Sequence, residues 1–154
     1  MKRKDLASLL ALSVGLASGT VNIHRLALAQ GVDPLVMVVN KNNGGISPMN
    51  KITARKLLLG EIANWPNGSN VVIVLKPAGS SDRVTVLGKV CGMSEAEFTR
   101  HNLQAMFMGE TVASAQQEAS ASAVRNFVKA NLGALSFLHK SELDENVKVV
   151  WTLE

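Results

Sequence analysis

A short segment in the middle of the chain combines residue types that bind small anions. The candidate ligand-binding residues are Lys76, Gly79, Ser80, Ser81 and Asp82. Backbone N–H groups at the start of a helix point toward a ligand, and the helix dipole favours negative charge there. Glycine lets the backbone approach closely, serine hydroxyls donate hydrogen bonds, and lysine adds a positive charge. If this loop joins a strand to a helix, its chemistry is that of an oxyanion site.

A second interpretation of the same loop stays open. A serine at a helix start usually caps its own backbone. Asp82 is expected in the first helical turn, where the dipole would stabilise its own carboxylate. That carboxylate would repel a dianion by about 1 kcal/mol in a solvated site, although a protonated oxygen of the ligand would donate a hydrogen bond to it. The loop is therefore either an oxyanion site or the capped start of a helix.

The sequence contains little that an enzyme would need. Beyond residue 29 it has two histidines, His101 and His139, and one cysteine, Cys91. It has no Gly-x-Ser-x-Gly motif and no His-x-x-x-His spacing. We therefore expect no enzyme activity, no catalytic residues, no metal and no cofactor, and we expect both histidines to be surface or hydrogen-bonded polar residues. The lone cysteine cannot pair within the chain, so we expect it to be a small buried apolar residue.

The apolar pattern predicts the elements that position the loop. Short β-branched runs predict strands over residues 34–39, 71–75, 134–138 and 147–151. Capping residues and apolar spacing predict helices from a Ser47 cap to Gly60, over about 82–90, from a Ser94 capping box to Gly109, and over about 115–131. The apolar stripes expected to face the core include Met49–Ile52–Leu59, Val84–Leu87–Cys91 and Leu103–Met106–Phe107.

This alternation of strands and helices predicts an α/β domain with a mostly parallel sheet flanked by helices. Ligands of such sheets bind beyond the carboxyl ends of the strands. Two loops meet that description, one after Val39 and one from Lys76 to Asp82. The second has the better anion chemistry.

The first 29 residues are typical of a secretory signal peptide. A basic start (Lys2, Arg3 and Lys4) precedes the apolar run 6–17, and the small-residue site 27–29 follows. The alternative is a membrane anchor, but a spanning helix needs about 20 mostly apolar residues. We therefore predict a signal peptide over residues 1–29, an exported periplasmic protein, and one α/β domain over residues 30–154.

The charge distribution bears on the partners of the domain. The chain has 16 Lys and Arg against 12 Asp and Glu, with 47% hydrophobic residues, which predicts a folded protein. Residues 1–29 hold four of the basic residues and one acidic residue, so the domain keeps 12 against 11. The apparent basicity thus belongs to the targeting segment. Without clustered cations or tyrosines, nucleic-acid binding is not expected.

Four motifs resemble those of the phosphate-binding proteins of ABC transporters. They are Val38–Asn40, Leu57–Trp65 (LLLGEIANW), Val72–Ser81 (VIVLKPAGSS) and Gly133–Phe137 (GALSF). The resemblance extends from about residue 35 to 151, and its most specific element is the Leu-Gly-x-Ile-x-x-Trp run. It implies a periplasmic binding-protein-like fold, no enzyme activity, and phosphate-binding roles for Lys76, Ser80, Ser81 and Asp82.

The resemblance also implies partners. Phosphate or a similar small anion is the expected ligand, and an inner-membrane transporter or sensor is the expected protein partner. The domain is as short as a single lobe of such proteins, so a homodimer would supply the other wall of the site. A competing hypothesis is an envelope interaction or sensory-accessory domain that keeps the fold and does not bind phosphate.

Overall fold

The computed structural model describes residues 31–154, with the exception of residues 45, 111 and 113. The predicted signal peptide lies outside the described residues. Residues 33–154 form one compact unit, and the description below concerns this unit. Among the described residues, no helix is long and apolar enough to span a membrane.

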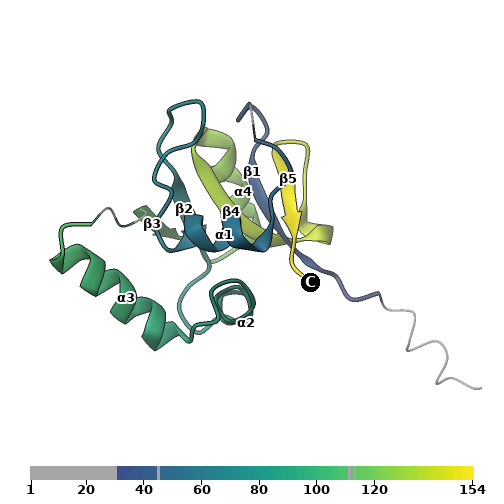
Figure 1. The fold of residues 1–154 in the computed structure, drawn as a ribbon. Helices are drawn as coiled ribbons and strands as arrows, with labels where there is room; N and C mark the ends of the chain where they lie inside the picture. Colours follow the sequence, from purple (N-terminus) through teal and green to yellow (C-terminus); the bar gives the residue numbers. More distant parts are fainter. Residues whose placement is uncertain (1–30, 45, 111, 113) are drawn as a thin grey trace, which may run out of the picture. The chain divides into compact units, whose positions relative to one another are not determined.

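The compact unit contains one sheet of five strands and its flanking helices (Figure 1). The strands are β1 (Leu35–Asn40), β2 (Val72–Leu75), β3 (Ser114–Gln117), β4 (Ala134–His139) and β5 (Val147–Thr152). The helical elements are α1 (Lys51–Leu58), α2 (Ser81–Val86), the π-helical η3 (Leu87–Cys91), α3 (Glu95–Phe107), α4 (Ala121–Ala130) and the 3₁₀ turn η4 (Lys140–Glu142). The strand order is β3-β2-β4-β1-β5. This arrangement confirms the predicted α/β class.

The first strand runs against the other four. β2 pairs in parallel with both β3 and β4, whereas β1 pairs antiparallel with both β4 and β5. Four strands therefore share one direction, as the mostly parallel prediction requires, but two of the four strand pairings are antiparallel. This reversal corrects the prediction that the loop after Val39 is a second candidate ligand loop at the carboxyl ends of the strands. Because β1 runs the other way, that loop lies at the opposite end of the sheet from Lys76.

Both faces of the central strands β1, β2 and β4 are buried. Met37 and Val39 of β1 point into one core cluster with Ile73, Trp65 and the apolar residues of α1 and η3. Val36 and Val38, on the other face, pack with Val124 and Val128 of α4. Figure 1 shows α4 behind the sheet, on the face opposite α1. This double coverage explains why β1 and β4 read as continuous apolar runs rather than alternating ones.

Helix boundaries differ from the predictions at two places. Residues 115–117, predicted as the start of a helix, belong to strand β3, and α4 begins only after the Ser120 cap. Pairing with β2 decides the structure of this segment, since its Ser-Ala-Gln-Gln sequence has no strong intrinsic preference. Helix α1 is capped by Asn50, whose side chain accepts a hydrogen bond from the Thr53 N–H, and not by Ser47. The Ser94 capping box is confirmed.

The predicted apolar stripe of α3 does not face the core. Leu103, Met106 and Phe107 are 50%, 65% and 90% exposed, while Phe98 and Ala105 are buried. Ile52 and Val84 are also exposed, so the stripes predicted on α1 and α2 are wrong at these positions. Apolar spacing alone selected the wrong face because each short helix carries apolar residues on two sides.

Gly133 is fixed by a close backbone contact that leaves no room for a side chain. A Cβ atom at this position would meet the Asn70 carbonyl oxygen at 1.9 Å. We expect Gly133→Ala to lower the free energy of unfolding by about 1–3 kcal/mol, the usual cost of overpacking. Urea denaturation measures the change. Gly88→Ala is the control, because nothing lies within 4 Å of its Cβ; an equal loss in both variants would contradict the explanation.

Candidate functional site

The predicted anion loop lies between β2 and α2, as expected. Lys76 directly follows β2, and Gly79 has φ 84°, a left-handed conformation that favours glycine. Ser80 is the N-cap of α2, and its hydroxyl accepts a hydrogen bond from the Arg83 N–H at 3.4 Å. The capping interpretation therefore holds for Ser80. Ser81 is the first residue of α2 and is exposed.

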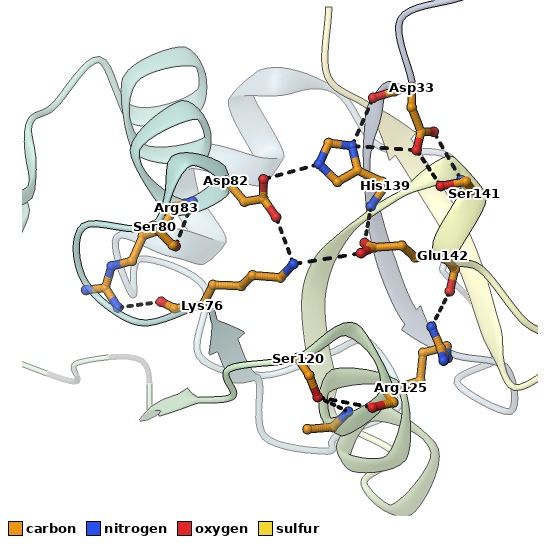
Figure 2. Close-up of polar contacts among 12 residues, drawn as sticks. Asp33, Lys76, Ser80, Asp82, Arg83, Ser120, Arg125, His139, Ser141 and Glu142 are labelled. Carbon is orange, nitrogen blue, oxygen red and sulfur yellow. Dashed lines mark hydrogen bonds and ion pairs between the residues drawn. The ribbon is translucent and has the colours of Figure 1, made fainter.

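Lys76 and Asp82 form an ion pair at this edge of the sheet. The Lys76 Nζ lies 2.8 Å from Asp82 Oδ2 and 3.9 Å from Glu142 Oε1 (Figure 2). The side chains of Lys76 and Asp82 are only 16% and 17% exposed, so solvent screens their attraction incompletely. The charge of Lys76, which the sequence analysis expects to attract a ligand, is therefore already next to two carboxylates of the protein.

His139 contacts the other oxygen of the same carboxylate. Its Nε2 lies 3.2 Å from Asp82 Oδ1, and its Nδ1 lies 2.9 Å from the backbone carbonyl oxygen of Asp33. The reversed direction of β1 explains this meeting, because it pairs Leu35 with His139 and so places Asp33 at the carboxyl edge of β4. The sequence analysis treated His139 as an ordinary polar residue and did not place it beside Asp82.

A network of hydrogen bonds holds the turn after β4. The His139 N–H donates to Glu142 Oε2 at 2.8 Å, and the Ser141 N–H donates to Asp33 Oδ1 at 3.0 Å. The Ser141 hydroxyl also donates to the second oxygen of Asp33. Three carboxylates, those of Asp33, Asp82 and Glu142, therefore surround Lys76 and His139.

The contacts shift the acid–base equilibria of this cluster. Burial tends to raise the pKa of Asp82, but the hydrogen bonds from Lys76 and His139 outweigh it and hold the pKa below its ordinary value. The Asp33 carbonyl raises the pKa of His139; burial opposes this shift, and Asp82 adds to it. Both shifts favour a charged pair. The stability that Asp82 contributes is lost as pH falls through its lowered pKa, and that of His139 as pH rises through its raised pKa.

Arg83 holds the loop in place through its guanidinium, and the sequence analysis did not predict this role. Its Nε and one terminal nitrogen contact the two carboxylate oxygens of Glu95 at 2.9 and 2.5 Å, and its other terminal nitrogen donates to the Lys76 carbonyl oxygen at 3.2 Å. Arg83 is only 8% exposed. The guanidinium therefore ties the end of β2 to the start of α3. No sequence motif marks it, since its partner lies 12 residues away.

Other chemistry is limited in the described part of the chain. Residues 31–154, outside positions 45, 111 and 113, contain no group of three or more His, Cys, Asp and Glu side chains arranged to hold a metal ion. Cys91 is buried, as predicted, and burial raises the pKa of its thiol to about 11. A cavity of about 450 Å³ lies between the segment before α1 and Trp65, and none of the five candidate residues lines it.

Comparison with solved structures identifies the fold. An ABC-type phosphate transport receptor from Vibrio cholerae matches with TM-score 0.60 and 19% identity, over 77% of this chain and 46% of the receptor. A phosphate ABC transporter substrate-binding protein from Clostridium perfringens, solved with bound phosphate, matches with TM-score 0.61 and 20% identity, over 77% and 44%. PstS from Borrelia burgdorferi matches with TM-score 0.57 and 11% identity, over 77% and 47%.

These similarities confirm the predicted resemblance at the level of fold. The chain has the fold of the matching part of phosphate transport receptors and spans less than half the length of these three structures. No family model matches the sequence, and no curated protein matches it. The similar structures belong to transport receptors and not to enzymes. Oxyanion binding by Lys76, Gly79, Ser80, Ser81 and Asp82 stays a prediction.

Replacing Arg83 tests its structural role. Arg83→Ala removes the partner of Glu95 and leaves the Lys76 carbonyl without its donor, so we expect the free energy of unfolding to fall by about 2–3 kcal/mol. Arg100→Ala, at an exposed position of α3, is the matched control and should stay within about 0.5 kcal/mol of the parent. Denaturant unfolding of both variants provides the measurement. Equal stability of the two would show that Arg83 does not hold the loop.

Proposed function

We propose that this protein is an exported solute-binding protein, not an enzyme, and that it binds phosphate or a related small oxyanion at the loop between β2 and α2. The observation that carries the proposal is the fold, which follows phosphate transport receptors over 77% of the chain. The predicted signal peptide and the position of Lys76 at the carboxyl end of β2 support it. The protein partner would be a membrane transporter or sensor.

Lys76 would be the main attraction for the ligand. Its ammonium contacts Asp82, which directly follows the exposed Ser81, and the left-handed turn at Gly79 lies between Lys76 and Ser81 in the chain. An anion bound there would accept hydrogen bonds from the ammonium and from Ser81. The Ser80 hydroxyl accepts a bond from the Arg83 N–H and keeps its own proton available to donate.

Asp82 sets the main condition on binding. Its carboxylate contacts Lys76 at 2.8 Å, so an incoming oxyanion must either displace it or bind as a protonated species that donates to it. Two unit charges of the same sign 4 Å apart repel by about 1 kcal/mol in water and by more in a drier site. Phosphate binding is therefore expected to be weak, and monoanionic forms are expected to be preferred over dianions.

Two observations favour a second candidate function. Lys76 already has Asp82 and Glu142 as partners, so the loop is electrostatically satisfied without a ligand. In addition, α3 exposes Leu103, Met106 and Phe107. A domain of this kind would serve in the envelope as an interaction or sensory-accessory module that keeps the fold of a phosphate receptor and no longer binds phosphate.

Calorimetric titration with phosphate and sulfate tests the proposed ligand. We expect the parent protein to bind phosphate, Lys76→Ala to lose binding, and Asp82→Asn to bind at least about fivefold more tightly because about 1 kcal/mol of repulsion is removed. A ligand present at 100 times its Kd stabilises the fold by about 2.7 kcal/mol, so thermal unfolding provides an independent measurement.

Lys89→Ala is the matched control for the lysine, because Lys89 is exposed and lies on η3. It should bind phosphate like the parent. If neither the parent nor Asp82→Asn binds any anion, the ligand hypothesis is wrong. Recovery of a membrane protein by the parent and by Lys76→Ala alike would then support the interaction module.

A further inference from the structure

We infer that His139 acts as a pH-sensitive latch that joins the segment before β1 to the start of α2. The three parts meet at the carboxyl edge of the sheet: Asp33 precedes β1, Asp82 lies in the first turn of α2, and His139 ends β4 (Figure 2). This inference concerns the fold itself and does not rest on the proposed ligand.

The geometry requires a doubly protonated imidazole. The His139 Nδ1 faces the Asp33 carbonyl oxygen at 2.9 Å, and Nε2 faces Asp82 Oδ1 at 3.2 Å. A carbonyl oxygen and an ionised carboxylate oxygen only accept hydrogen bonds. Both ring nitrogens must therefore donate, and only the imidazolium carries a proton on each. A neutral ring satisfies one of the two contacts and turns a lone pair toward the oxygen of the other.

The charges around the ring come from every element that packs against it. Asp33 contributes a carboxylate oxygen 3.9 Å from Nδ1, and Asp82 contributes the direct partner of Nε2. Glu142 of η4 accepts from the His139 backbone N–H, and Lys76 at the end of β2 contacts both Asp82 and Glu142. Three acidic groups against one lysine leave a net negative surrounding, which favours the imidazolium.

Deprotonation has a definite structural consequence. A neutral ring carries a single N–H, so one of its two bonds, to the Asp33 carbonyl or to Asp82, is lost. Asp82 then retains Lys76 as its partner. The bridge that the ring makes between the segment before β1 and the start of α2 is thereby broken.

The sign of the pH dependence follows from these partners. The pKa of His139 is raised in the folded protein, so its contribution to stability is complete below the unfolded value of about 6.5 and is lost as pH rises through the folded pKa. The pKa of Asp82 is lowered, so its contribution is lost only as pH falls through that value. The latch is therefore closed in mildly acidic solution and opens on the alkaline side.

An NMR titration of the full chain between pH 4.5 and 9.5 tests the latch. We expect the His139 ring to titrate above about 6.5, the ordinary pKa of histidine, and the Arg83 amide signal at the start of α2 to move with the His139 midpoint. Asp82→Asn should lower the His139 midpoint and remove the coupled shift of Arg83. The thermal midpoint of the parent should fall by a few degrees above the His139 midpoint.

His139→Gln and His101→Gln form the matched pair. The first should abolish the alkaline fall in thermal stability, and the second should leave it unchanged, because the His101 ring contacts the Leu59 carbonyl and, among the described residues, no carboxylate. A His139 midpoint at or below the ordinary value of about 6.5 would overturn the latch. The latch would also be overturned if the Arg83 amide signal does not shift over the pH range in which His139 titrates. If His139→Gln does not fold, the midpoints in the parent and in Asp82→Asn still decide the question.

Discussion

The reversed direction of β1 is the constraint on which the candidate site depends. β1 lies between β4 and β5 and pairs antiparallel with both. Its first residue therefore meets the last residue of β4, and Asp33 reaches the carboxyl edge where β2 delivers Lys76. A parallel β1 would bring the Asn40 end to this edge. Asn40 lies at the opposite edge and donates its side-chain amide to the carbonyls of Val128 and Lys129 at the end of α4.

The cluster at this edge shows how one carboxylate can take the position expected for a ligand. Asp82 uses one oxygen for Lys76 and the other for His139, which are the cationic groups that an oxyanion would seek. The fold is that of phosphate transport receptors, whereas the local charge is negative. These two facts explain why the fold alone does not decide the ligand, since function resides in the site and not in the architecture.

Local features of this structure could be predicted from the sequence, and long-range ones could not. The four β-branched runs become strands within one residue of their predicted bounds. In β1, β2 and β4, burial on both faces leaves a continuous apolar signature. Strand β3 lacks that signature and exists through pairing with β2. The direction of β1 has no sequence signal, and the contact between His139 and Asp33 spans 106 residues. The positions of Lys76 and Ser80 beside α2 followed from local pattern, but the partners of Lys76 and Asp82 did not.

The exposed end of α3 has a consequence for the chemical ageing of the protein. Met106 and Met108 are each 65% exposed, whereas Met37 is fully buried in the sheet. An oxidant reaches a thioether in proportion to its exposure and converts it to a polar sulfoxide. Among the methionines of the described residues, these two are therefore the most accessible to an oxidant, and their oxidation would make this apolar tip more hydrophilic while the buried Met37 keeps its thioether.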